Sequence, residues 1–167
     1  MKRLTLITLL LLSTNLLAEM MPLVTLEKEA GGRLDGSLWS SSELVNKVHV
    51  LFYVDPDEKD LNEPLSERLK AENFDRANYQ SIAVINMAAT WLPNFALESS
   101  LKSKQEKYPD TTYVKDFDKL LVKKWSLKDD SNNVILFDKK GNVLYKIMGA
   151  ASAEQIEEFI GLIKKNL

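Results

Sequence analysis

The 167-residue chain contains no cysteine and a single histidine, His49. Without cysteine it can form no disulfide bond, use no thiol as nucleophile or electron carrier, and bind no metal through sulfur. One histidine also excludes a metal centre built from several imidazoles. Thiol redox chemistry and the usual cysteine or multi-histidine metal sites are therefore closed to this protein.

Two further features are missing: an excess of basic residues and a second long hydrophobic run. The chain has 22 Lys and Arg residues against 24 Asp and Glu residues. This balance predicts no general attraction to nucleic acid. The remaining composition, 45% hydrophobic and 28% charged, is ordinary for a globular protein.

One apolar run is present, at the N-terminus. Lys2-Arg3 precedes Leu4–Leu12, and Ala18 stands before Glu19. A basic start, an apolar core too short to span a bilayer and a small residue before a polar one are typical of a secretory signal peptide. We expect cleavage after Ala18, a periplasmic location and no stable membrane span afterwards. A retained membrane anchor is the alternative, since Leu16, at the third position before the expected cleavage point, is larger than the small residue usual at that position.

Residues 1–18 are thus the predicted signal peptide and residues 19–167 the predicted mature domain. That length suffices for one domain and is too short for two. Hydrophobic periodicity and capping signals then predict alternating strands and helices. The predicted strands are 48–54, 81–86, 111–115, 134–137 and 143–147, and the predicted helices are 63–72, 95–107, 118–125 and one capped by Ser152.

This order predicts an α/β fold with a central mixed β-sheet flanked by helices. The first strands follow one another through helices, which makes them parallel, and the last two form a hairpin around Gly141. Val48–Val54 is apolar on both faces, as is typical of a strand buried inside a sheet. A short helix from Ser40 to Val45 and a turn at Gly31–Gly36 between short strands complete the N-terminal part.

The order of elements resembles the thioredoxin-like sandwich, and several stretches resemble the YtfJ family of exported bacterial proteins. The stretches are Leu44–Val48, Leu97–Lys102 with Lys107–Pro109, Trp125–Leu127, and Phe137–Val143. The resemblance covers nearly the whole mature chain. It implies a periplasmic thioredoxin-like protein, of a family whose activity is not established.

The resemblance also locates the position where redox relatives carry their chemistry. In them, the turn after the first central strand holds Cys-x-x-Cys at a helix N-terminus, where amide dipoles stabilise a thiolate. Asp55–Glu58 occupies that turn here, and Asn132 or Asn133 stands near the place of the family's cis-proline. Thiol–disulfide exchange and peroxidase activity are therefore excluded.

Three carboxylates in that turn, Asp55, Asp57 and Asp60, could supply oxygen ligands to calcium. The turn lacks the glycine and the downstream glutamate of a calcium loop. The favoured interpretation is a solvated turn in which Asp60 or Asn62 caps the next helix. We accordingly predict no metal and no cofactor.

Two patterns raise the possibility of a hydrolase. Ser99 and Lys102 form Ser-x-x-Lys, a spacing that some acyl-transferring enzymes use to activate serine. Their companion motifs are absent, and the pattern lies inside a predicted helix, which favours an exposed helix face. His49 is expected to be a structural residue of the first central strand with a backbone partner.

The loop from Met87 to Phe95 is the best candidate for recognition. It follows the second central strand and should reach the same sheet end as Asp55, where open α/β sheets bind ligands. Trp91, with Leu92 or Met87 beside it, could form an apolar docking patch. The alternative is that Trp91 folds down as a lid on the core.

We therefore expect a non-catalytic binding protein for a peptide, protein or small molecule. Its candidate surface combines the acidic turn, this loop and a loop over 131–133. The candidate residues are Asp55, Asp57, Asp60, Met87, Trp91, Leu92 and Asn132. The alternatives are a non-thiol hydrolase built on Asp55, Asp57 and Ser99 or Ser100, and a structural subunit of a periplasmic complex.

Overall fold

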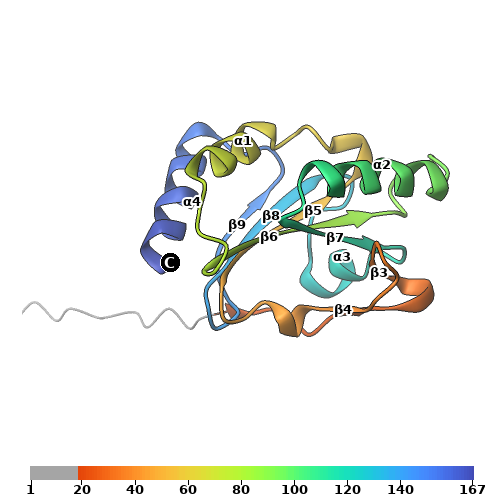
Figure 1. Ribbon diagram of the computed structural model, residues 1–167, viewed down its shortest axis with the longest axis horizontal. Helices are drawn as coiled ribbons and strands as arrows, with labels where there is room; N and C mark the ends of the chain where they lie inside the picture. Colours follow the sequence, from red (N-terminus) through yellow and green to blue (C-terminus); the bar gives the residue numbers. More distant parts are fainter. Residues whose placement is uncertain (1–18) are drawn as a thin grey trace, which may run out of the picture.

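The computed structural model describes residues 19–167, so the predicted signal peptide lies outside the described residues. A seven-stranded mixed sheet forms the centre, with helices on both faces (Figure 1). The strands are β1 (Glu19–Met20), β2 (Thr25–Leu26), β3 (Gly31–Arg33), β4 (Trp39–Ser40), β5 (Val48–Val54), β6 (Tyr79–Asn86), β7 (Thr111–Asp116), β8 (Asn132–Phe137) and β9 (Asn142–Met148). The helices are α1 (Glu63–Glu72), α2 (Asn94–Lys107), α3 (Leu120–Trp125) and α4 (Ala153–Asn166), with 3-10 turns η1 (Lys28–Ala30), η2 (Ser41–Glu43) and η3 (Pro56–Glu58).

The strand order is β1-β9-β8-β5-β6-β7-β3. β5, β6 and β7 are parallel, and β8 runs antiparallel to β5 before turning back as β9. This arrangement confirms the predicted mixed sheet. β2 and β4 pair with each other in a separate two-stranded ribbon.

β5 lies in the middle of the large sheet, between β6 and β8. Its bounds match the predicted strand, and five of its seven residues are buried. A strand hydrogen-bonded on both edges and covered on both faces needs apolar residues throughout, which explains the unbroken run VHVLFYV.

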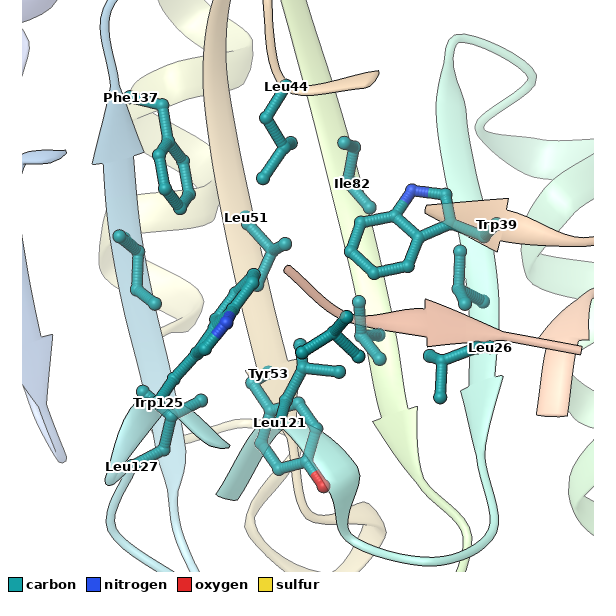
Figure 2. Close-up of a cluster of buried hydrophobic side chains, with 14 residues drawn as sticks. Leu26, Trp39, Leu44, Leu51, Tyr53, Ile82, Leu121, Trp125, Leu127 and Phe137 are labelled. Atoms are coloured by element: carbon teal, nitrogen blue, oxygen red, sulfur yellow. The ribbon is translucent and has the colours of Figure 1, made fainter. Parts of the chain in front are cut away.

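Each face of the sheet carries its own core. On one face, α1 and α4 cover residues such as Val50 and Leu136, and α2 covers the end of β6 and β7. On the other face, α3 and the β2–β4 ribbon close a cluster containing Trp39, Trp125 and Phe137. Figure 2 shows this cluster, with the hydroxyl of Tyr53 pointing toward the carboxyl ends of the parallel strands.

Helix α4 shows how sequence fixes one of these layers. Ser152 accepts a hydrogen bond from the amide of Gln155, whose side chain accepts one from the amide of Ser152, completing the predicted capping box. The four apolar residues expected to face inward are all buried; they are Ile156, Phe159, Ile160 and Ile163. None of the helices among residues 19–167 is long and apolar enough to cross a membrane.

Two N-terminal elements differ from the prediction. The turn expected to begin at Gly31 instead starts with strand β3, which pairs with β7. Gly31 has φ +136°, and an added Cβ would lie 1.9 Å from the carbonyl oxygen of Lys115, so only glycine fits. The helix capped by Ser40 is the single 3-10 turn η2, which ends at Glu43 and not at Val45.

Candidate functional site

The carboxyl ends of β5, β6 and β7 lie side by side at one edge of the sheet. Asp55 follows β5, Asn86 ends β6 and Asp116 ends β7, and Asn86 pairs in register with Asp116. Open α/β sheets bind ligands at this edge. We call this region, with turn 55–60, loop 87–93 and the polar groups beneath them, the strand-end site.

Asp55 is buried, with 3% of its surface exposed, although it begins the acidic turn. Its Oδ1 accepts a hydrogen bond from the amide of Asp57 at 2.9 Å, which caps η3. Burial raises the pKa of the Asp55 carboxyl above its ordinary value of 3.8, and the negative charges of Asp57 and Asp130 act in the same direction. The Asp57 amide only partly offsets this rise.

The loop after β6 combines a buried anchor with an exposed tip. Met87 is buried against α2, whereas Trp91 is 86% exposed and Leu92 is 36% exposed. The hydroxyl of Thr90 donates to Oδ1 of Asp57 at 3.2 Å, which ties the loop to the acidic turn. Trp91 is therefore not a lid on the core.

Tyr53 and Asp116 form a buried pair beneath the site. The Tyr53 hydroxyl donates to Oδ2 of Asp116 at 3.1 Å. Asp116 also accepts hydrogen bonds from the backbone amides of Leu120 at 3.0 Å and Leu121 at 3.1 Å. These bonds hold the first turn of α3, which begins at Leu120, two residues later than predicted. Burial, followed by the charge of Asp116, raises the pKa of the Tyr53 hydroxyl, so the phenol stays protonated.

A second polar group joins β6 to the segment before β8. Lys119 Nζ donates to Oδ2 of Asp129 at 2.8 Å, which raises the pKa of Lys119 and lowers that of Asp129. The Asn86 side-chain amide donates to Asp129 at 3.3 Å. Oδ1 of Asn86 is buried and has no hydrogen-bond partner among the described residues.

Asn132 is buried at the other side of the turn. It belongs to the start of β8 and not to a loop, and 2% of its surface is exposed. Its carbonyl oxygen accepts from the side chain of Asn62 at 3.3 Å. Asn62 also donates to the carbonyl of Gly149 at 2.9 Å and accepts from the amide of Ala151. Asn62 thus links three segments rather than capping α1.

The acidic turn is a solvated turn and not a preformed metal site. Asp57 and Asp60 are exposed, whereas Asp55 is buried beneath them. Within residues 19–167, no group of three or more histidine, aspartate or glutamate side chains is placed to hold a metal ion. The expectation that Asp60 or Asn62 caps α1 is wrong, because the N-cap side chain makes no capping hydrogen bond.

The groups considered for hydrolysis do not converge. His49 lies near the start of β5, so six residues of strand, roughly 20 Å, separate it from Asp55. Its Nδ1 contacts the carbonyl of Lys47 at 2.9 Å, as expected for a structural histidine, and burial lowers its pKa. Ser99 and Lys102 are both exposed on α2. Neither His49 nor the Ser99–Lys102 pattern therefore gives support to a hydrolase at the strand-end site.

Two shallow concavities lie at the opposite end of the parallel strands. One, of about 320 Å³, is lined by residues that include Arg33, Gln105 and Thr111. The other, of about 240 Å³, includes Lys47 and Tyr79. Neither is lined by a residue of the strand-end site.

Sequence reasoning located the edge but missed the polar residues beneath it. Asn86, Asp116, Lys119 and Asp129 were not chosen as candidates. Asn86 and Asp116 could have been found because each places a polar side chain at the end of an apolar strand. Lys119 and Asp129 carry no such signal. They lie ten residues apart in the sequence, and only the folded chain brings their side chains together.

Comparisons with known proteins agree with this architecture. Residues 25–166 match the model of a family described as "Bacterial protein of unknown function (YtfJ_HI0045)". The uncharacterized protein YtfJ of Escherichia coli is 29% identical over 133 residues, covering 77% of this chain and 72% of that protein. An uncharacterized protein of Haemophilus influenzae is 32% identical over 130 residues, covering 75% and 70%.

A putative thioredoxin from Neisseria meningitidis has a similar solved structure. The TM-score is 0.60 at 20% sequence identity, covering 87% of this chain and 90% of that one. At this level of identity the likeness shows the fold alone. The fold is thioredoxin-like, as the order of elements in the sequence predicted.

Proposed function

The chain belongs to the bacterial family of unknown function YtfJ_HI0045, and we propose that it is a periplasmic binding protein that recognises a protein partner without catalytic turnover. One observation carries this proposal: Trp91 is 86% exposed at the strand-end site. Exposed tryptophan leaves a large apolar surface in water, and tryptophan is enriched where proteins dock. Leu92 extends the same apolar tip.

The acidic turn places negatively charged side chains beside this apolar tip. Asp57 and Asp60 are exposed, and Thr90 holds the loop against Asp57. An apolar centre with a charged rim is the usual anatomy of a protein interface. The partner we infer presents an apolar side chain flanked by lysine or arginine.

The buried Asp55 supports the same assignment. Burial, and after it the neighbouring carboxylates, raise the pKa of the Asp55 carboxyl and disfavour its charged form. Buried ionisable groups with perturbed pKa values concentrate at functional sites. Because its Oδ1 accepts the amide of Asp57, we assign Asp55 to shaping the turn that meets the partner.

Export supports a periplasmic partner. The basic start, the apolar run Leu4–Leu12 and Ala18 before Glu19 are the features of a cleaved signal peptide. Fractionation of cells that express the full chain should place a protein beginning at Glu19 in the periplasmic fraction.

Site-specific photo-crosslinking tests the binding role. A photoreactive amino acid replaces Trp91 in the full chain, and a control chain carries it at Leu38, which is 50% exposed but lies beside the β2–β4 ribbon. In living cells we expect one dominant adduct from position 91 that is absent from position 38. Adducts of equal pattern from both positions, or an adduct only between two copies of this chain, would contradict the proposed partner.

A further inference from the structure

Three polar side chains form a row across the ends of the parallel strands, on one face of the sheet. The register of β5 and β6 makes Asp55 the neighbour of Asn86, and Asn86 pairs with Asp116. Side chains two residues apart in extended chain share a face. The residues two positions before the three members of the row are all buried in the cluster beneath α3; they are Tyr53, Val84 and Val114.

Asn86, in the middle of the row, is 1% exposed and has only one end of its side-chain amide satisfied. Its Nδ2 donates to Oδ1 of Asp129 at 3.3 Å. This contact fixes the orientation of the amide, because the flipped amide would set its oxygen against a carboxylate. Oδ1 of Asn86 has no hydrogen-bond partner within residues 19–167. A buried acceptor of this kind needs a donor.

Asp55, the first member of the row, is a buried carboxylate without a counter-ion. Its neighbours Asp57 and Asp130 are themselves negative. Lys119 pairs with Asp129 at 2.8 Å and lies 3.9 Å from Asp130. Within the described part of the chain, no lysine or arginine forms an ion pair with Asp55. A buried charge is costly until a cation pairs with it.

We propose that Asp55 and Asn86 together receive the side-chain ammonium of a lysine of the protein partner, an inference that rests on the binding role proposed above. Neighbouring strands lie about 4.8 Å apart, so one nitrogen can donate to oxygens of both residues. A lysine ammonium carries three donors on a compact charge. It therefore neutralises the carboxylate and supplies the donor that the amide oxygen needs.

The path to this pair leads between the acidic turn and the loop after β6. The turn begins at Asp55, and the loop begins directly after Asn86. The Thr90 hydroxyl joins the two segments by donating to Asp57 at 3.2 Å, in an exposed contact that can part. Trp91 follows Thr90 in the chain. A lysine next to the apolar residue that docks on Trp91 is therefore placed over the entry.

Variants of the photo-crosslinking chain, with the photoreactive amino acid at position 91, test this inference in living cells. Asp55→Asn keeps an acceptor for the Asp57 amide and removes the charge, so the yield of the partner adduct should fall at least about tenfold. Asp75→Asn is the matched control and should leave the yield unchanged. Asp75 accepts the Ala77 amide at 2.9 Å in the same way, but before the start of β6, at the other end of the strands.

Asn86→Leu keeps the size of the side chain and removes its oxygen, so it should lower the yield severalfold. The thermal midpoint of each purified variant separates lost binding from lost folding. An unchanged yield with Asp55→Asn overturns this inference and leaves the proposed function standing. The absence of any adduct from position 91 contradicts the proposed function, and this inference with it.

Carbodiimide coupling of the captured complex identifies the cation. The reagent condenses a carboxylate with an adjacent lysine amine to an amide, with loss of water, and it does not join a carboxylate to a guanidinium. Mass spectrometry should find Asp55 joined to a lysine of the partner. A product that joins Asp55 only to Lys119 of the same chain, or a complex in which Asp55 stays uncoupled, overturns the inference.

Discussion

At the scale of single residues, Asp55 is a buried carboxylate whose charge is not needed for the hydrogen bond that it accepts. Its carboxylate has lost most of its contact with water and lies near Asp57 and Asp130. Its one structural service is to accept the Asp57 amide at 2.9 Å. An asparagine oxygen could accept the same hydrogen bond without the charge, so the cap alone does not require a carboxylate.

The replacement Asp55→Asn is therefore predicted to raise the thermal midpoint at neutral pH by a few degrees. The folded-state pKa lies above the unfolded value of 3.8, so any stability from the protonated carboxyl is present below that value and lost as pH rises through the folded pKa. Scanning calorimetry of both proteins at several pH values measures the difference, which should shrink toward zero in acid. A variant less stable than wild type at neutral pH would show that the charge itself stabilises the turn.

At the scale of elements, Asp116 determines where α3 begins. It accepts hydrogen bonds from the Tyr53 hydroxyl and from backbone amides at the start of the helix. Lys119, which precedes α3, has left-handed backbone angles, so the chain needs this carboxylate to hold the turn. α3 in turn places Leu121 and Trp125 in the cluster shown in Figure 2.

We predict that Asp116→Ala lowers the free energy of unfolding by about 2–4 kcal/mol, because it leaves several buried donors without an acceptor. Urea denaturation followed by circular dichroism measures this loss. Asp118→Ala, an exposed position in the same turn, serves as the control and should change little. Equal effects of the two substitutions would mean that Asp116 does not specifically hold α3.

Elements with a long periodic pattern were predictable from sequence, and those set by tertiary contacts were not. β5 and α1 were predicted with their observed bounds, since a nearly unbroken apolar run and a helix with proline in its first turn leave clear signals. α3 starts at Leu120 and not at Asp118, because the cap comes from the side chain at the end of β7. At the site, the turn and loop were located, but burial of Met87 and Asn132 depends on contacts with distant segments.

At the scale of the whole molecule, the chain has a thioredoxin-like fold without cysteine. Its N-terminal residues close both edges of the sheet, with β1 beside β9 and β3 beside β7 (Figure 1). Strands of two or three residues carry no periodic signal, which is why the sequence indicated short N-terminal strands around Gly31–Gly36 without giving their bounds. Sheet edges covered in this way leave the loops at the strand ends as the natural place for recognition.

The most direct test of this binding role compares Trp91→Ala with wild type in two measurements on the same samples: capture of the crosslinked partner and thermal midpoint. Because Trp91 is 86% exposed, its loss should weaken capture at least about tenfold and leave the midpoint in place. Leu23→Ala, at an apolar position that is 67% exposed, should change neither value. Unchanged capture with a large fall in the midpoint would contradict the account and make Trp91 a structural residue.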